Sequence, residues 1–403
     1  MTKVRQLASS PIVILACALA TRLAATVYIF ATYAPPRMLF VGNESSNIAK
    51  ALVSGLGFSS PYAHTPVAPT AQQPPIYPLF VAGIFKVFGV FTTQSAWAIT
   101  AFHIAAGAIT ALLILRLGTI YFKKNVGTIA AWLWVLPWSY EARAFEARAF
   151  DLTVSSHALA ALGFTSLLLL IPKVMELNHG WLALGVCAGL LVLLQPPFLI
   201  VFIVYAVWLA WRSRYSPRML LAVAGLLAVL APWTVRNYVQ FGRLIPIRDN
   251  FGLELWLGNH PGMHGTVDYS HDFPGKDPTN YVRLGEIAFM DSKLHEANDF
   301  IVSDPISFVG RCFHRVIEFW YQPLPFSWIL VSVVGWIGAG FALRTHPLGW
   351  FFVIPLITFP LVYYITHVFA HYRHPIDPVI LLLAAYALVE MAPKRQKEAV
   401  LET

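Results

Sequence analysis

Residues 96–119 read AWAITAFHIAAGAITALLILRLGT, an apolar run of 24 residues. A helix of about 20 apolar residues crosses the ~30 Å hydrocarbon core of a bilayer, so this run predicts a transmembrane helix. Outward from it, nine further apolar runs cover residues 12–33, 126–142, 152–171, 180–195, 196–211, 217–234, 326–343, 348–368 and 378–393. Together they predict an all-α polytopic membrane protein with about ten transmembrane helices.

The composition supports a membrane protein. The 403-residue chain is 57% hydrophobic and 12% charged, whereas soluble domains are near half apolar and about a quarter charged. Its mean hydropathy is +0.62. These values exclude a soluble enzyme, a disordered protein and a nucleic-acid binder built on charge. Two of the three cysteines, Cys17 and Cys187, lie in apolar runs, so the sequence contains no disulfide framework.

The placement of the net charge of +8 predicts how the chain crosses the membrane. Cytoplasmic loops of membrane proteins carry an excess of Lys and Arg. With ten spans and a cytoplasmic N-terminus, the short inner segments hold Lys3, Arg5, Lys123, Lys124, Lys173, Arg212, Arg214, Arg218, Arg344, Lys394, Arg395 and Lys397. We therefore expect both termini in the cytoplasm and the protein in the inner (plasma) membrane. Four polar segments then share the outer face: 34–95, 141–151, 235–325 and 369–377.

Residues 76–91, IYPLFVAGIFKVFGVF, form an apolar run that is short and contains Lys86. An eleventh span here would place Lys123–Lys124, Arg212–Arg218 and the basic C-terminus on the outer side, against the usual distribution of charge. We therefore expect an interfacial or re-entrant helix on the outer face of the membrane.

A short amphipathic helix is predicted within residues 43–58, NESSNIAKALVSGLGF. Asn43 is a suitable N-cap residue, and Glu44 would lie in the first turn. One interpretation of Glu44 is a carboxylate favoured by the helix dipole. The other is a general base held at the membrane surface. The residues alone leave both interpretations open.

A second acidic residue, Asp151, ends the tandem pentapeptide EARAFEARAFD at 141–151. On a helix, Arg143 and Glu146 are three residues apart and suit an ion pair. Asp151 differs because it lies at the mouth of the next predicted span. A carboxylate there is costly unless it has a cation, a metal or a substrate amine as partner.

The outer mouth of the last span reads HYRHPIDP, residues 371–378. One interpretation is an interfacial belt in which Arg373 extends towards the headgroups. The other is an anion clamp, in which Arg373, Tyr372, His371 and His374 offer donors at the depth of a lipid phosphate. Both interpretations are open at this point.

In their order and spacing, these segments resemble the GT-C superfamily of integral-membrane glycosyltransferases. The resemblance is strongest to bacterial relatives of the protein O-mannosyltransferases and the lipid A aminoarabinose transferases, and it covers most of the chain. The segments that carry it are Glu44, AKALVSGLGFSSPY at 49–62, TAQQPPIYPLFVAGIFKVFG at 70–89, Phe150–Asp151, PWTVRNY at 232–238, RDNFGLELWLGNHP at 248–261 and HYRHPIDP at 371–378.

The resemblance implies a glycosyltransferase that takes a sugar from a polyprenyl-phosphate donor on the outer face and passes it to a hydroxyl of a lipid, glycan or protein acceptor. It implies a catalytic acid in the first outer loop, which maps to Glu44, and a second acid before a later span, which maps to Asp151. Some relatives bind a divalent metal through such acids and others do not. Glu44 and Asp151 are therefore also candidate ligands of Mg or Mn.

The same resemblance implies how the donor phosphate is bound. Relatives that transfer aminoarabinose have a basic residue just before the Pro-Pro pair, where this chain has Gln73. Either other groups bind the phosphate or the donor differs. Lys86 and Arg373 are the expected substitutes, and Tyr372 and His371 are further candidate donors to the phosphate. Because a phosphate leaves without being protonated, one carboxylate base and one cationic clamp suffice, and a single step would invert the anomeric centre.

Three parts are expected in the chain. They are a membrane module at 1–234 with the catalytic first outer loop, an outer subdomain at 235–325, and C-terminal membrane helices with a cytoplasmic tail at 326–403. One alternative function is a transporter or flippase for a lipid-linked glycan, which should show repeat symmetry and polar groups near mid-membrane. Another is a non-catalytic subunit of an envelope glycan assembly complex, which would lose the acids. Polar segments on one face, together with Glu44 and Asp151, favour the enzyme.

Overall fold

The computed structural model describes residues 6–32, 35–136, 154–212, 216–261, 272–321 and 326–392. These residues form helices and connecting segments without a β-strand, and one isolated antiparallel bridge pairs Ser59 with Pro69. The expected all-α class is therefore confirmed.

Each of the ten predicted apolar runs contains a helix. These helices are α2 (Pro11–Thr32), α5 (Thr93–Tyr121), α6 (Lys124–Val135), α7 (His157–Leu177), α8 (Trp181–Val192), α9 (Phe198–Arg212), α10 (Met219–Phe241), α15 (Phe326–Thr345), α16 (Gly349–Thr358) with α17 (Leu361–Ile365), and α18 (Asp377–Met391). By length and composition, α2, α5, α7, α10 and the stretch His371–Met391 could each cross a membrane. Shorter apolar helices of this set are α8, α9, the stretch Ile329–Thr345 of α15, and α16 with α17.

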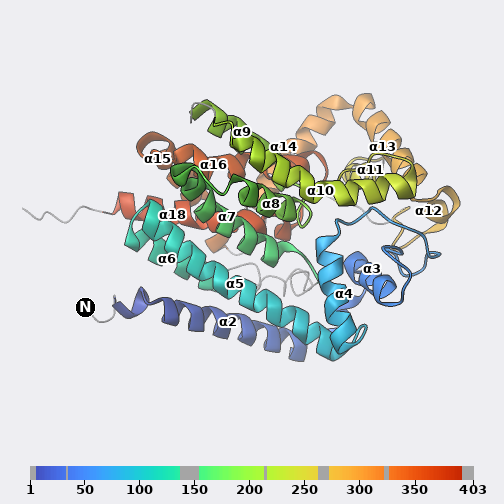
Figure 1. Ribbon diagram of the computed structural model, residues 1–403, viewed down its shortest axis with the longest axis horizontal. Helices are drawn as coiled ribbons and strands as arrows, with labels where there is room; N and C mark the ends of the chain where they lie inside the picture. The colour runs from blue at the N-terminus through green and yellow to red at the C-terminus, as the bar shows by residue number, and fades with distance from the viewer. Residues whose placement is uncertain are drawn as a thin grey trace, which may run out of the picture.

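The polar segments between these helices contain shorter helices. They are η1 (Pro36–Phe40), α3 (Glu44–Val53), α4 (Ile76–Phe88), α11 (Phe251–Leu257), α12 (Thr279–Leu284), α13 (Glu286–Ser303), α14 (Pro305–Tyr321) and η3 (Ala370–Ile376). Figure 1 shows α3, α4, α11, α12 and α13 gathered at one end of the molecule, opposite the start of α2 and the end of α18. The 13 residues of α4 rise about 20 Å, too short for the ~30 Å hydrocarbon core.

Short connections between the long helices meet at the opposite end. His346, between α15 and α16, stacks on Phe122, which follows α5, with 4.6 Å between ring centroids. Lys123, at the start of α6, forms an ion pair with Glu390 near the end of α18, with 2.5 Å between nitrogen and oxygen. The segments that the sequence assigns to one side of the membrane thus lie together.

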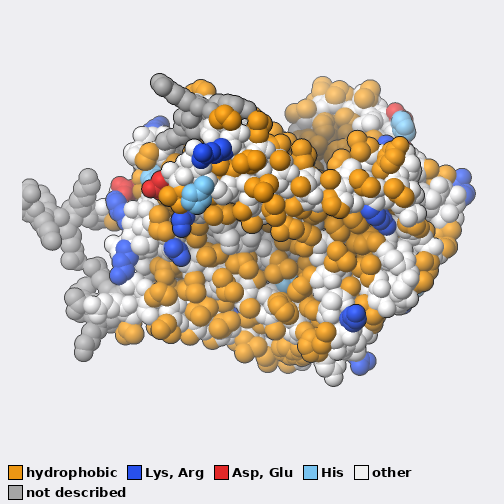
Figure 2. Space-filling view, in the orientation of Figure 1, with side chains coloured by type: hydrophobic (Ala, Val, Ile, Leu, Met, Phe, Trp, Pro, Cys, Tyr) orange, Lys and Arg blue, Asp and Glu red, His pale blue; other side chains and the backbone are white. Residues whose placement is uncertain are grey.

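The outer surface of the helical bundle is apolar. Figure 2 shows hydrophobic side chains over the middle of the visible face, with most Lys and Arg side chains towards its left and right ends. As one example, helix α10 exposes Leu220, Leu227, Val235 and Val239. Because a soluble surface rarely carries so continuous an apolar area, this surface is suited to lipid and the protein is an integral membrane protein.

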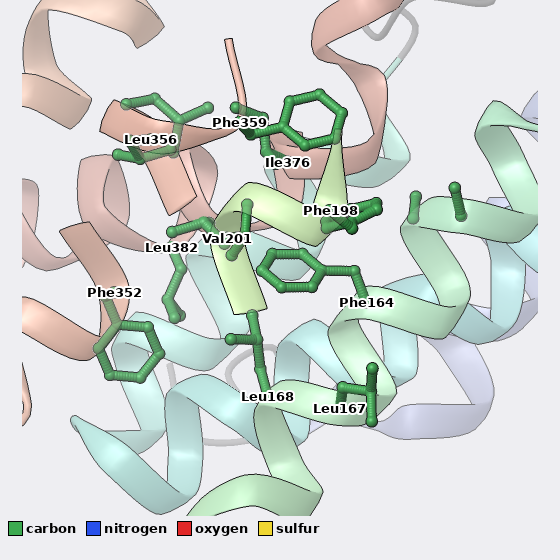
Figure 3. Packing of buried hydrophobic residues seen from close by; sticks show 14 of the residues in the cluster. Phe164, Leu167, Leu168, Phe198, Val201, Phe352, Leu356, Phe359, Ile376 and Leu382 are labelled. Carbon is green, nitrogen blue, oxygen red and sulfur yellow. The ribbon is translucent and has the colours of Figure 1, made fainter. Parts of the chain in front are cut away.

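The centre of the bundle is packed with aromatic and aliphatic side chains (Figure 3). Phe198 of α9 lies between Phe164 of α7 and Phe359 after α16, with 4.7 Å between ring centroids in both pairs. Leu168 of α7 and Leu382 of α18 belong to the same buried cluster. This cluster joins helices that are far apart in sequence and fixes the positions of their ends.

Glycines allow close contact between some of these helices. A Cβ atom on Gly338 of α15 would lie 1.9 Å from the carbonyl oxygen of Leu383 on α18. A Cβ on Gly340, two residues further along α15, would meet nothing within 4 Å. Small residues at such crossings bring helix backbones together in membrane proteins.

We expect Gly338→Ala to lower the melting temperature of the detergent-purified protein, because α15 must move away from α18. Overpacking of this kind typically costs about 1–3 kcal/mol. Gly340→Ala is the matched control, and it should leave the melting temperature unchanged or slightly higher because alanine favours helix. Equal effects of the two substitutions would contradict the close contact of α15 and α18.

Candidate active site

Glu44 is the first residue of α3, and Asn43 fixes the start of this helix. The Asn43 side chain accepts a hydrogen bond from the Ser46 backbone nitrogen at 2.8 Å, as the sequence predicts for an N-cap. Its amide also donates to the carbonyl oxygen of Val154 at 2.9 Å. The helix that carries Glu44 is thereby tied to the segment that precedes α7.

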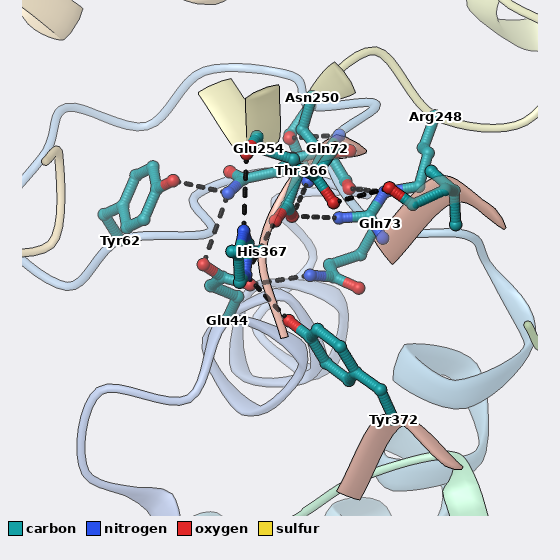
Figure 4. A network of polar contacts seen from close by, with 12 residues as sticks. Glu44, Tyr62, Gln72, Gln73, Arg248, Asn250, Glu254, Thr366, His367 and Tyr372 are labelled. Carbon is teal, nitrogen blue, oxygen red and sulfur yellow. Dashed lines mark hydrogen bonds and ion pairs between the residues drawn. The ribbon is translucent and has the colours of Figure 1, made fainter. Parts of the chain in front are cut away.

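Two consecutive glutamines hold the Glu44 carboxylate (Figure 4). They belong to residues 70–73, which we call the glutamine strap. The Gln73 amide donates to Glu44 Oε2 at 2.6 Å, and the Gln72 amide donates to Glu44 Oε1 at 3.3 Å. The Gln72 amide also donates to the hydroxyl of Tyr62. Both carboxylate oxygens therefore accept hydrogen bonds from neutral donors.

A second polar chain approaches from the segment around α11. Arg248 lies 2.9 Å from Glu254 Oε1, measured from its Nη2 atom. Glu254 Oε2 lies 3.5 Å from Nε2 of His367, which in turn is 3.0 Å from the hydroxyl of Tyr372. This chain of polar contacts connects α11 with the segment between α17 and α18 (Figure 4).

A cavity of about 740 Å³ lies between these elements. Its volume falls within the range of about 300–1,000 Å³ typical of small-molecule sites. Its polar lining includes Glu44, Gln72, Gln73, His157, Arg248, Glu254, Lys276, His371 and Tyr372, and its apolar lining includes Leu194, Pro196, Leu199, Ile200 and Val362. The cavity can thus contact both polar groups and hydrocarbon.

The cavity raises the pKa of Glu44 from 4.5 to about 7. Burial is the main cause, and the negative charge of Glu254 adds to it. The charge of Arg248 and the hydrogen bond from Gln73 act in the opposite direction. A carboxyl group with a pKa near 7 can both take up and release a proton at neutral pH, which suits a general base.

The structure brings together three of the residues singled out from the sequence: Glu44, His371 and Tyr372 all line the cavity. Lys86 does not join them, because its side chain is exposed on α4 and lies outside the cavity lining. Asp151 lies outside the described residues.

Arg373 lies neither in an interfacial belt nor in the cavity lining, the two positions that the sequence interpretations would require. Its side chain is only 2% exposed, so it does not extend towards the headgroups. Its Nε atom lies 2.7 Å from Asp377 Oδ1, and its Nη1 donates to Ser332 Oγ at 2.8 Å. The guanidinium thus ties η3 to α18 and α15 inside the bundle. It is not among the residues that line the cavity, and neighbouring His374 stacks on Trp134 instead.

Sequence reasoning did not assign roles to Arg248, Glu254 or the two glutamines. All four lie in segments that carry the family resemblance, 70–89 and 248–261. Two patterns in the sequence could have indicated these residues. Arg248 and Glu254 are six residues apart on either side of a helix start, and two glutamines directly precede Pro74–Pro75. Neither pattern indicates by itself which distant segment it will meet.

A metal site receives no support from the part of the chain that the structure describes. Within it, no group of three His, Cys, Asp or Glu side chains could hold a metal ion. Both oxygens of Glu44, one of the two expected ligands, accept hydrogen bonds from amides. The described residues alone therefore do not form a site for Mg or Mn, and Asp151, the other expected ligand, lies outside them.

The raised pKa of Glu44 should make protein stability depend on pH. Because the folded pKa of about 7 lies above the usual value, the stability from protonated Glu44 is complete below about pH 4.5 and is lost as the pH rises through 7. We expect Glu44→Gln to melt at a higher temperature than the unsubstituted protein at pH 8.5 and at a similar temperature at pH 5. Glu176→Gln, on the exposed surface of α7, controls for charge removal. The same difference in melting temperature between Glu44→Gln and the unsubstituted protein at both pH values would refute the raised pKa of Glu44.

Comparison with known proteins identifies the fold. No family model matches the chain, and no curated protein matches its sequence. Among solved structures, ArnT from Cupriavidus metallidurans bound to undecaprenyl phosphate is similar, with a TM-score of 0.54 and 14% identity over 95% of this chain and 60% of that chain. The archaeal oligosaccharyltransferase AglB from Archaeoglobus fulgidus, in complex with an inhibitory peptide and a dolichol-phosphate, gives a TM-score of 0.53 and 14% identity over 93% of this chain and 50% of that chain.

The same archaeal oligosaccharyltransferase tethered to an acceptor peptide gives a TM-score of 0.51 and 13% identity, over 94% of this chain and 49% of that chain. The present chain thus spans about half to three fifths of the length of these structures. ArnT and AglB are both GT-C glycosyltransferases. With its helices arranged as in these structures, the chain has the fold of the GT-C membrane glycosyltransferases.

Proposed function

We propose that this protein is an integral-membrane glycosyltransferase that moves a sugar from a polyprenyl-phosphate donor to an acceptor hydroxyl. The observation that carries the proposal is a carboxyl group with a pKa of about 7, that of Glu44, in the same cavity as the Arg248 guanidinium. The undecaprenyl phosphate and dolichol-phosphate in similar structures support a lipid phosphate as the donor.

In this mechanism Glu44 is the general base. Its ionised carboxylate takes the proton of the acceptor hydroxyl, and the oxygen attacks the anomeric carbon of the donor sugar. The bond between that carbon and the phosphate oxygen breaks, and its electron pair leaves with the polyprenyl phosphate. Because attack and departure occur on opposite faces of the carbon, the single step inverts the anomeric centre.

Arg248 is the group we assign to the departing phosphate, in place of Arg373. Its Nε donates to the carbonyl oxygen of Gln72 at 3.1 Å, and its Nη2 pairs with Glu254. Its Nη1 has no hydrogen-bond partner among the described residues and remains available to a phosphate oxygen. Charge-assisted hydrogen bonds of this kind are about twice as strong as neutral ones. Tyr372 and His371 supply further polar contacts in the same cavity.

The proposed division of the chain follows from the origin of the lining residues. The membrane module, 1–234, supplies Glu44 and the glutamine strap. The outer subdomain, 235–325, supplies Arg248 and Glu254, and we assign acceptor binding to it because it adds these charged groups and Lys276 to the cavity lining. The C-terminal helices, 326–403, supply Tyr372. The apolar lining from α9 and α17 is suited to the hydrocarbon of the donor lipid.

We also propose that the cavity opens on the outer face of the inner (plasma) membrane, with both termini in the cytoplasm. The support is the distribution of charge: the short basic connections gather at the end of the molecule opposite α3 and α11. Such connections are usually cytoplasmic.

Glu44→Gln should reduce the rate of transfer by about 10²–10⁴-fold, because the base is lost while the side chain keeps its size. In the unsubstituted protein the rate should rise with pH through about 7, the pKa of Glu44. Release of polyprenyl phosphate from a panel of polyprenyl-phosphate sugars, with candidate acceptors, measures both effects. Glu44→Asp, which keeps the base, should retain part of the activity.

Arg248→Gln should weaken donor binding by about tenfold or more, since a charge-assisted hydrogen bond contributes about 1.5–3 kcal/mol. Lys86→Gln is the matched control, because it removes a positive charge that lies outside the cavity. Binding of a polyprenyl phosphate to the purified protein is the measurement. Loss of affinity in Lys86→Gln, with normal affinity in Arg248→Gln, would reverse the assignment.

The same assay separates the proposed enzyme from its alternatives. A flippase would carry the lipid-linked glycan across a vesicle membrane without releasing polyprenyl phosphate. A non-catalytic subunit would neither release nor carry it, and Glu44→Gln would then change nothing but stability.

A further inference from the structure

Charged side chains from three separate elements hold the glutamine strap in place. Arg236 of α10 donates from Nη1 to the carbonyl oxygen of Thr70 at 2.7 Å. Glu286 of α13 accepts from the backbone nitrogen of Ala71 at 2.6 Å. Arg248 donates from Nε to the carbonyl oxygen of Gln72 at 3.1 Å. Three consecutive residues are therefore fixed through their backbones by ionisable groups.

Three of the four strap residues are shielded from water, and Gln73 is half-buried. Thr70 and Ala71 are fully buried, and Gln72 is 1% exposed. Buried hydrogen bonds are stronger than exposed ones because water does not compete for the donor and acceptor. Pro74 and Pro75 follow directly and restrict the backbone on the other side. The glutamine amides thus have little freedom to move away from Glu44.

The two oxygens of Glu44 are held unequally. Oε2 accepts a hydrogen bond of 2.6 Å from Gln73, whereas Oε1 accepts one of 3.3 Å from Gln72. The Gln72 amide is also engaged with the Tyr62 hydroxyl. A hydrogen bond of 3.3 Å is longer than the optimum of about 2.9–3.0 Å and correspondingly weak. Oε1 is therefore the oxygen that can most readily exchange its partner.

We propose that Gln73 is a positioning residue for this proposed reaction: it fixes Glu44 through Oε2, leaves Oε1 as the atom that accepts the proton, and sets the pH range in which the base works. The inference rests on the proposed function and deepens it. It assigns a role to an uncharged side chain and requires no group that the structure does not describe.

The physical reason is the neutrality of the amide. A hydrogen bond from Gln73 favours the ionised carboxylate, but less than a full positive charge at the same place would. Other ionisable groups that act on Glu44 are Arg248, Glu254, Tyr62 and Tyr281. With a neutral partner at Oε2, burial outweighs the stabilising contacts and the pKa of Glu44 stays near 7. A cation there would give a carboxylate that is always ionised and a weaker base.

Two substitutions of opposite sign test this role in the full-length protein. Gln73→Leu removes the hydrogen bond and should move the midpoint of the pH–rate profile up by about one unit, whereas Gln73→Lys should move it down by about one unit or more. At pH 7 the rate of Gln73→Leu should fall severalfold and recover at higher pH, with little change in the KM for the donor. Gln240→Leu and Gln240→Lys, at an exposed position on α10, are the matched controls.

A second measurement needs no substrate. The melting temperature of each Gln73 variant is compared, across the pH range, with that of the same variant carrying Glu44→Gln, and the difference reports the proton of Glu44 alone. This subtraction matters because burial and the neighbouring Glu286 raise the pKa of Asp249, beside the strap, above its usual value. If Gln73→Leu does not fold, Gln73→Lys still provides the comparison.

The outcomes separate this inference from the proposed function. One outcome is that the pH midpoint of the melting-temperature difference moves up in Gln73→Leu and down in Gln73→Lys, while no variant transfers sugar. In that case the effect of Gln73 on the Glu44 proton stands and the transferase proposal fails. If transfer occurs but both midpoints remain that of the unsubstituted protein, or both move in the same direction, the role of Gln73 is overturned. A matching shift in the Gln240 controls would likewise overturn it.

Discussion

The structure depends on the absence of water from the hydrocarbon core of a bilayer. Backbone groups in that region must pair within their own helix, and charged side chains are driven to the helix ends. In this chain the ends at one side collect short basic turns, while those at the other collect α3, α11 and the segment before α18 (Figure 1). The exclusion of water therefore favours helices and also gathers the polar groups at the helix ends. These groups need not be close to one another in the sequence.

At the polar end, the position of each side chain depends on a partner from another segment. Glu44 is held by Gln72 and Gln73, and Glu254 is held by Arg248. Arg373, by contrast, does not line the cavity. It is paired with Asp377 inside the bundle and holds helices together there. Removing one member of such a buried pair is costly, since the other charge remains without a partner.

The electrostatics of the cavity follow from the kind of partner each acid has. Glu254 is paired with a guanidinium, whereas the direct partners of Glu44 are amides. Burial and the neighbouring negative charge therefore dominate at Glu44, and its pKa rises to about 7. A buried carboxyl group with a raised pKa is a common feature of enzyme active sites.

Features that depend on neighbouring residues could be predicted from the sequence. Runs of apolar residues predicted the membrane helices, Asn43 predicted the start of α3, and the basic turns predicted which connections would lie together. Tertiary structure alone decided which polar groups meet. Lys86 and Arg373 carry a positively charged side chain as Arg248 does, but of the three only Arg248 lines the cavity, because the rotation of each helix and the path of each loop depend on packing against distant segments. Helix formation is a local property, whereas a site made of residues 44, 73, 248 and 372 exists only after the chain has folded.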